Sequence, residues 1–257
     1  MYKTNGMKGL VYKELLLKRK TLFWALLIWL LLFILTVSIC LSMDFGNLTK
    51  NENLTAESMV IFSYLLAAIA MISLISSDST VYIDAKCHWN RFEYTLPVSA
   101  KKIAAVKIFL MGASALLALV ISLFTSWVIS TLSHTALDFT VIKNITVIML
   151  ICMIISVFST LLMFRYKNPQ TVIAILFGFF TVIFAVIAVW YFRKMNLAGN
   201  QFGEMSGEEL MTHTFNIFAD KYAEIRDMIF PFSALIFAVI IALGYILFTR
   251  QLERREN

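Results

Sequence analysis

The sequence has few of the residues that bind metals or form disulfides. It contains three cysteines: Cys40 and Cys152 fall inside apolar runs, and Cys87 lies in a polar segment. Their spacing fits neither a disulfide framework nor a zinc site. Cys87 and His88 are neighbours, but two ligands do not complete a tetrahedral site, so we interpret them as surface residues of a helix. We therefore expect no metal and no cofactor on this chain.

Charged side chains are absent from the long apolar runs, apart from Glu57 at an edge. Ion-coupled transporters generally place ionisable residues at membrane depth, so this absence argues against proton or sodium coupling by the chain. The sequence also lacks a G-x-x-x-x-G-K-[ST] phosphate loop, and its nine glycines are scattered. The chain is therefore not predicted to hydrolyse ATP, and any active transport must draw its energy from a partner.

Apolar residues dominate what is present. The 257 residues are 60% hydrophobic with a mean hydropathy of +0.81, whereas a soluble domain is nearer half apolar. Six runs are long enough to cross a bilayer, which takes about 20 residues. These runs are Thr21–Met43, Ala56–Ser77, Ile108–Leu132, Ile145–Phe164, Gln170–Phe192 and Met228–Thr249. The prediction is one all-α membrane domain over residues 1–257 with six transmembrane helices.

Basic residues are distributed unequally between the connectors. Of the 22 Lys and Arg, 16 lie in the two terminal segments and in the connectors 78–107 and 165–169. Positive charge accumulates on cytoplasmic loops, so both termini are predicted to be cytoplasmic. The net charge of +6 reflects these loops. No basic face typical of nucleic-acid binding is present.

The first 20 residues mix lysines with leucines. Six Lys or Arg alternate with apolar residues such as Leu10 and Leu15. This pattern predicts an amphipathic helix lying on the inner leaflet, with its lysines near anionic lipid headgroups. A cleavable signal peptide is not expected, because the following apolar run is too long and has no small-residue cleavage site.

The segment from Asp78 to Lys107 separates the second and third runs and carries five basic residues. The segment from Tyr82 to Tyr94 contains neither Gly nor Pro, so it is predicted to form a short helix. Leu96 precedes Pro97, and a residue before proline is pushed to extended geometry, which ends that helix. Ser99 is then a suitable N-cap for a helix entering the third run. A cytoplasmic loop of this kind is where a partner would act.

The connector from Arg193 to Asp227 is the longest on the opposite side. Ser206 and Glu209 form a capping box for a helix of residues 208–227, about 30 Å long, and Pro231 marks the bend into the last run. An apolar stripe recurs at spacings of 3, 4 and 3 on one face; its members are Phe215, Phe218, Tyr222 and Ile225. Its charges keep this helix out of the membrane, so the stripe covers the outer mouth of the bundle, the same helix on a second copy, or the lipid surface.

Serines repeat within two of the runs. Ser122, Ser126 and Ser130 are four residues apart and share one helix face, and Ser73 lies near the inner end of the second run. Small polar residues of this kind commonly serve close helix packing. The alternative is that these four serines line a substrate path.

Two motifs carry a resemblance to a known family. TLPVSAKKI, which is followed by Lys107, resembles the loop between the second and third spans of ABC-2 type transporter permeases, and MKGLVYKELLLKRK (Met7 to Lys20) is similar to the opening segment of that family. With six spans, the resemblance covers essentially the whole chain. Within the family, the chain looks most like the permeases of bacterial exporters for phenol-soluble modulins and related peptides.

This resemblance implies a function and a set of partners. The chain would be the permease subunit of an exporter in the bacterial cytoplasmic membrane, paired with a second copy or a related permease and with ABC ATP-binding subunits that hold ATP and Mg. Residues 78–102 would be the coupling loop, the turn after Arg165 a second contact, and residues 193–228 a roof over the exit. The predicted docking residues are Tyr82, Asp84, His88, Trp89, Arg91, Phe92, Glu93, Leu96, Pro97, Arg165 and Lys167.

Three cargo or role assignments follow. Charge-free spans and the narrower resemblance favour amphipathic or hydrophobic peptides as cargo. A permease for lipids or small drugs is one alternative, and a non-transporting immunity or assembly subunit is another.

Overall fold

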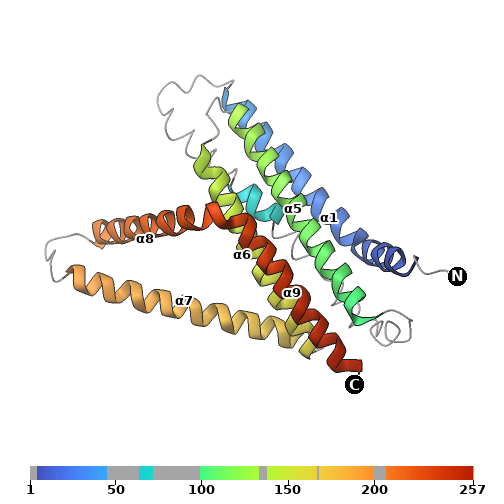
Figure 1. Cartoon of the computed structure of the whole chain (residues 1–257). Helices are drawn as coiled ribbons and strands as arrows, with labels where there is room; N and C mark the ends of the chain where they lie inside the picture. Colours follow the sequence, from blue (N-terminus) through green and yellow to red (C-terminus); the bar gives the residue numbers. More distant parts are fainter. Residues whose placement is uncertain are drawn as a thin grey trace.

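The computed structural model describes residues 5–44, 64–71, 99–132, 138–166, 168–199 and 207–256. Within these residues every regular element is helical, which confirms the all-α prediction (Figure 1). The labelled elements are α1 (Asn5–Asp44), α5 (Ala100–Leu132), α6 (Phe139–Tyr166), α7 (Pro169–Gly199), α8 (Gly207–Ile229), the short 3-10 helix η1 (Phe230–Phe232) and α9 (Ser233–Glu256). Residues 64–71 form a further short helix.

Four stretches of the described chain are long and apolar enough to cross a membrane: Lys8–Ser38, Ala100–Leu132, Phe139–Tyr166 and Ala219–Arg254. They correspond to the first, third, fourth and sixth predicted spans. Of the predicted second span, only 64–71 lies within the described residues. The predicted fifth span lies within α7, where Gln170–Ile183 is the apolar part that is described. The chain is therefore a multi-pass helical membrane protein, and the number six stays a prediction.

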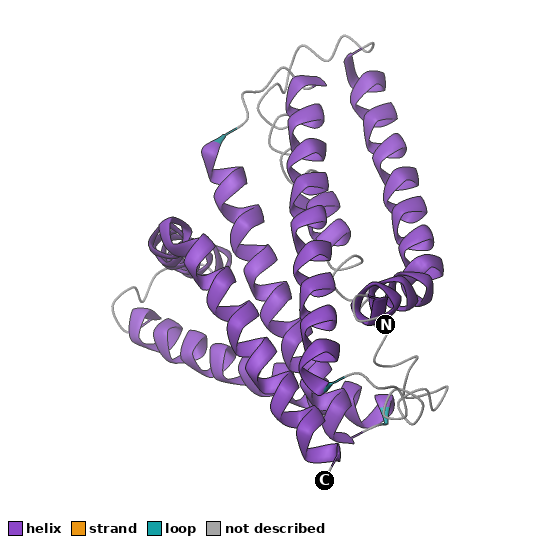
Figure 2. Cartoon of the chain, turned by 45° about the vertical axis from the view of Figure 1, so that its right-hand side comes forward, coloured by secondary structure: helices purple, strands orange, loops and turns teal. Residues whose placement is uncertain are grey.

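The centre of the molecule is a bundle of α5, α6 and α9, against which α1 packs through α5 (Figure 2). Its core includes the fully buried side chains of Met111, Met153 and Phe248. Two glycines bring α5 and α9 close together. A Cβ on Gly112 would lie 2.7 Å from Ile241 Cδ1, and one on Gly244 would lie 2.6 Å from Ile108 Cδ1. Larger residues at these positions would push the two helices apart.

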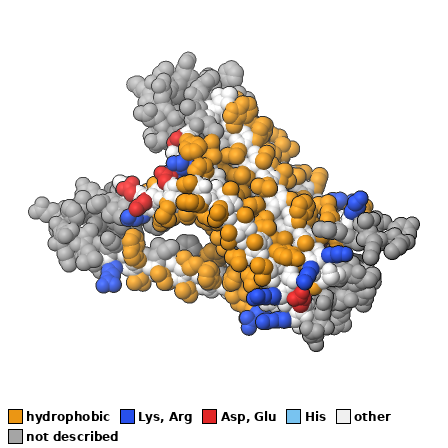
Figure 3. Space-filling view, viewed as in Figure 1, with side chains coloured by type: hydrophobic (Ala, Val, Ile, Leu, Met, Phe, Trp, Pro, Cys, Tyr) orange, Lys and Arg blue, Asp and Glu red, His pale blue; other side chains and the backbone are white. Residues whose placement is uncertain are grey.

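Helix α7 leaves this bundle. It packs against the end of α6 and against α8, and diverges from α9 in Figure 1. Between α7, α8 and the bundle, Figure 3 shows an opening rimmed by hydrophobic side chains. Several α7 side chains are more than 60% exposed, among them Ile173, Phe177 and Val189. Such a surface suits lipid or a second copy of the chain rather than water.

Local signals at the helix ends agree with the structure. The Asn168 side chain accepts a hydrogen bond from the Gln170 N–H (3.0 Å) and Pro169 is the first residue of α7, which are the residue types expected at the start of a helix. α5 begins at Ala100, directly after Ser99, as predicted. Pro231 lies in η1, between α8 and α9, at the bend visible in Figure 1. The helix predicted for residues 208–227 is confirmed as α8, and its place on the outer side of the membrane remains a prediction.

The two ends of the bundle differ in charge. We call the end where α1, α5 and α7 begin and α9 finishes the basic end, and the end where α8 joins α6 and α9 the α8 end (Figure 1). Lys and Arg gather at the basic end in Figure 3. The described helices run between the two ends in the directions that the unequal distribution of basic residues predicts. Assignment of the basic end to the cytoplasm remains a prediction.

The first turns of α1 run across the direction of its longer remainder (Figure 2). In this part of the helix Leu10 is buried in the core and Lys8 is exposed. The face that carries Leu10 therefore packs onto the bundle. Contact of the lysines with the inner leaflet remains a prediction.

Candidate functional site

Most of the predicted ATPase-docking residues lie outside the described part of the chain. These are Tyr82, Asp84, His88, Trp89, Arg91, Phe92, Glu93, Leu96, Pro97 and Lys167. Arg165 is described: it is exposed in the last turn of α6, with its guanidinium carbon 5.6 Å from the centre of the Tyr166 ring. An exposed cation at the basic end is available to a partner.

A buried ion pair joins α1 to α5 at the basic end. Glu14 Oε1 lies 2.9 Å from Lys107 Nζ, and the two side chains are only 3% and 4% exposed. Lys13 Nζ lies 3.7 Å from the same carboxylate oxygen. Removing two charges from water costs several kcal/mol per ion, which good geometry must offset. The pair therefore fixes the register of α1 against the start of α5, the helix that follows the predicted docking loop.

Sequence reasoning missed this pair. Counting charges placed Lys107 in a connector, whereas the structure buries it in α5. Glu14 was a usable signal, because it is the single acidic residue among the first 20. Lys18 is also buried, at 3% exposed. A single acidic residue among several lysines, one of which is buried, indicates an ion pair in the interior of the protein.

In the middle of the bundle, the serines pack between helices. The Ser122 hydroxyl donates to the Ala67 carbonyl of the 64–71 helix (3.2 Å), and both groups are buried. Ser126 is 2% exposed, and its hydroxyl has no hydrogen-bond partner within the described residues. Ser130 is partly buried, and Ser73 lies outside the described residues. Ser122 thus serves helix packing, and the substrate path through these four positions stays a prediction.

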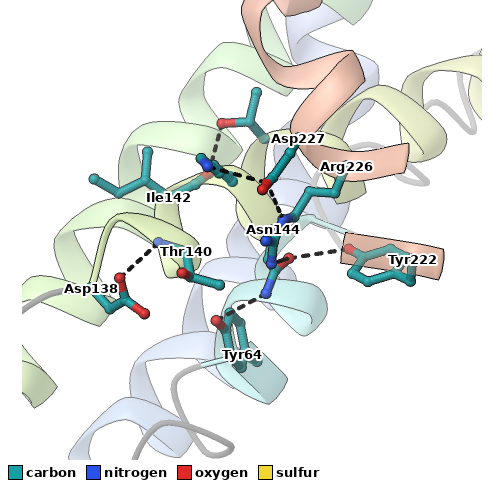
Figure 4. A network of polar contacts seen from close by, with 10 residues as sticks. Tyr64, Asp138, Thr140, Ile142, Asn144, Tyr222, Arg226 and Asp227 are labelled. Atoms are coloured by element: carbon teal, nitrogen blue, oxygen red, sulfur yellow. Dashed lines mark hydrogen bonds and ion pairs between the residues drawn. The ribbon is translucent and has the colours of Figure 1, made fainter. Parts of the chain in front are cut away.

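At the α8 end, one amide joins three elements (Figure 4). Asn144 in α6 donates through Nδ2 to the Tyr64 hydroxyl oxygen of the 64–71 helix (3.0 Å). Its Oδ1 accepts from the Tyr222 hydroxyl (3.3 Å) and from Arg226 Nη1 (3.2 Å), both on α8. The end of α8 is thereby held against the start of α6.

Charged groups surround this amide. Arg226 is 9% exposed, and its Nε donates to Asp227 Oδ1 at 2.9 Å. Lys143 Nζ donates to the same oxygen at 3.1 Å and lies 5.3 Å from the centre of the Phe139 ring. Phe139 in turn meets Phe230 of η1 edge-on, with 5.3 Å between ring centres. The network therefore continues past the bend between α8 and α9.

The start of α6 is capped beside this network. The Thr140 N–H donates to Asp138 Oδ1 (3.1 Å), and this bond holds the pKa of the Asp138 carboxyl below its usual value. Carboxylates at this position stabilise the first turn of a helix. The cap helps to fix Lys143 and Asn144, which lie in the following turns, toward α8.

A family model described as ABC-2 family transporter protein matches residues 9–247. The chain belongs to the ABC-2 transporter family. Searches of curated proteins and of solved structures each returned no match. This ABC-2 protein is thus the permease subunit of an ABC transporter, and ATP hydrolysis resides in a separate ABC ATP-binding subunit. Both the Glu14–Lys107 pair and the Asn144 network lie inside the matched residues.

The predicted extracellular gate lies on α8 of this permease. Phe215 and Phe218 are in the helix, the Tyr222 hydroxyl joins the Asn144 network, and the Ile225 side chain is 51% exposed. Half of Ile225 thus remains available to lipid or to a second copy. Coverage of an exit by these four residues stays a prediction.

The sequence reasoning did not identify Tyr64, Asn144 or Arg226 as contact residues. The stripe analysis considered apolar positions, yet Arg226 is the buried one among the described side chains of α8. Arg226 lies four residues after Tyr222, so the two share a helix face. The spacing of four residues between Tyr222 and Arg226 was therefore the feature of the sequence that could have identified Arg226 as a contact residue.

Proposed function

We propose that this permease exports amphipathic or hydrophobic peptides, similar to phenol-soluble modulins, across the bacterial cytoplasmic membrane. The observation that carries the proposal is the uncharged middle of an ABC-2 family bundle. Between the charged clusters at its two ends, the buried polar side chains of the described residues are hydroxyls: Thr36, Ser122, Thr125, Ser126, Ser156 and Thr160. A bundle whose middle buries no charged side chain among the described residues suits a cargo that carries a large apolar face.

The assembly we propose contains two permease copies, or one copy and a related permease, with two ATP-binding subunits. Residues 78–102 dock on an ATP-binding subunit, and Arg165 and Lys167 supply a second contact. ATP and Mg bind to the partner and close its dimer. The docking loop passes that motion into α5, and α8 acts as the lid over the exit.

Export is tested by reconstituting the permease with the ATP-binding subunit that co-purifies with it. An amphipathic helical peptide should stimulate ATP hydrolysis and accumulate in inverted vesicles. A scrambled peptide of the same composition, without a continuous apolar face, is the matched control and should do neither. Equal responses to both peptides would remove the basis for a peptide cargo and favour lipid or drug export. Failure to stimulate any ATPase would favour an assembly or immunity role.

The orientation is tested separately. With Cys40 and Cys152 changed to Ser, Cys87 is the single remaining thiol. A membrane-impermeant thiol reagent should label it only after cell lysis. Strong labelling of intact cells would place the basic end outside and contradict the proposal.

A further inference from the structure

Polar contacts to both α5 and α6 help to hold the 64–71 helix in place. Its core side chains are almost completely buried, with Met71 at 0% and Ala67 and Ala70 at 1% exposed. The Ala67 carbonyl accepts from Ser122 of α5, and the Tyr64 oxygen accepts from Asn144 of α6. The segment therefore has a defined position relative to both helices, and it lies within the predicted span that leads into residues 78–102.

Asn144 also accepts hydrogen bonds from two side chains of α8. Its Oδ1 accepts from Tyr222 and Arg226, while its Nδ2 serves Tyr64. One amide therefore orients partners on opposite sides, since it cannot turn to follow one without losing alignment with the other. Hydrogen bonds weaken steeply beyond about 3.2 Å or when bent. A small shift of the 64–71 helix is enough to change how α8 is held.

We infer that Asn144 couples the position of the 64–71 helix to the docking of α8. The inference rests on the proposed function in one respect, because it takes residues 78–102 as the site where the ATP-binding subunit acts. Asn144 is a positioning residue: movement of the loop displaces the 64–71 helix, the Tyr64 contact lengthens, and the amide releases Tyr222 and Arg226. Within the described residues, the contacts of Asn144 with Tyr64, Tyr222 and Arg226 form one connected set, through which the position of the 64–71 helix is passed to α8.

The sharpest variant is Tyr64→Phe, which removes the oxygen that Asn144 donates to and keeps the ring. Spin labels at Asp220→Cys on α8 and Thr131→Cys on α5 report the position of α8, because both side chains are exposed. The background carries Ser in place of Cys40, Cys87 and Cys152. Tyr245→Phe is the matched control, since Tyr245 is a partly buried tyrosine of α9 outside the network.

In the permease alone, Tyr64→Phe should broaden or displace the distance between the labels, whereas Tyr245→Phe should leave it unchanged. Asn144→Leu, which keeps a similar volume, should act in the same direction as Tyr64→Phe. A distance unaltered by both Tyr64→Phe and Asn144→Leu would overturn the inference. This measurement needs no ATPase, so it tests the role of Asn144 even if the proposed function is wrong.

In the complete transporter, the distance should change between the nucleotide-free and vanadate-trapped states of the wild type. Tyr64→Phe should abolish that change and lower peptide stimulation of ATP hydrolysis at least about fivefold, in the range of typical coupling between sites. A nucleotide-dependent change that persists in Tyr64→Phe would refute the coupling. Loss of ATPase co-purification in the wild type would instead refute the proposed function.

Discussion

The two ends of the bundle hold their helices in different ways. At the basic end, one carboxylate and one ammonium, Glu14 and Lys107, meet at 2.9 Å and are under 5% exposed. At the α8 end, contacts are shared around Asn144, and two of the three charged members remain partly in water, with Lys143 22% and Asp227 48% exposed, while Arg226 is buried. Water can compensate a lost contact at the exposed members of the α8 end, but it has little access to the buried pair.

Because of this difference, we expect the helices at the basic end to be less mobile than α8 at the other end. Separation of the buried pair would expose two charges to an apolar interior, so α1 and α5 should move together. The α8 end can release one hydrogen bond at a time at small cost. This arrangement suits the transporter proposed above, in which motion starts at the basic end and passes through the bundle before α8 is released.

The largest effect should come from Glu14→Gln. This change removes the carboxylate that lies 2.9 Å from the buried Lys107 ammonium, and breaking a buried ion pair from one side typically destabilises a protein by about 3–5 kcal/mol. Thermal unfolding of the purified permease in detergent measures the loss. The double variant Glu14→Gln with Lys107→Met removes both charges and should regain most of it. A single variant as stable as the wild type would remove the contrast between the two ends.

The next effect concerns the partner at the basic end. Trp89→Ala with Phe92→Ala removes two aromatic side chains from the predicted docking loop, and buried aromatic anchors contribute about 2 kcal/mol or more at interfaces. Membrane insertion and thermal stability of the permease should be unchanged, while co-purification of the ATP-binding subunit falls. Normal assembly and stimulation in this double variant would show that the docking surface lies elsewhere.

A smaller effect is expected at the α8 end from Arg226→Met. It removes the hydrogen bonds to Asn144 and Asp227, and loss of hydrogen bonds from a charged group costs about 1.5–3 kcal/mol. Part of this is regained because Lys143 still serves Asp227. Lys221→Met is the matched control, since Lys221 pairs with Glu224 on the exposed surface of the same helix, and it should leave the unfolding temperature unchanged. Equal losses in the two variants would contradict the buried role of Arg226.

The smallest effect should come from Tyr222→Phe. Its hydroxyl makes a hydrogen bond at 3.3 Å to an oxygen that Arg226 also reaches, so about 1 kcal/mol or less is at stake. Chemical unfolding of the permease should detect a small decrease that becomes larger when Arg226 is already Met, because Tyr222 is then the remaining donor to Asn144 Oδ1 among the contacts described. A loss as large as that of Glu14→Gln would show that the α8 end is as rigid as the basic end.

The sequence predicted local features well and tertiary partners poorly. Asn168 with Pro169, and Pro231, act through the backbone of their own neighbours, so their roles could be read from order along the chain. The apolar spans were equally visible. Asn144 looked like a polar residue flanking a span, because its partners Tyr64 and Tyr222 lie about 80 residues away on either side. Glu14 and Lys107 were separated in the same way, and counting basic residues by connector assigned Lys107 to a surface.

The most direct measurement is hydrogen exchange of the reconstituted transporter in its nucleotide-free and vanadate-trapped states. The account predicts that exchange increases in residues 207–229 on trapping, while exchange in residues 8–20 and 100–107 stays the same. The opposite outcome, with altered exchange around Glu14 and Lys107 and an unchanged α8, would contradict a fixed basic end and a releasable outer helix.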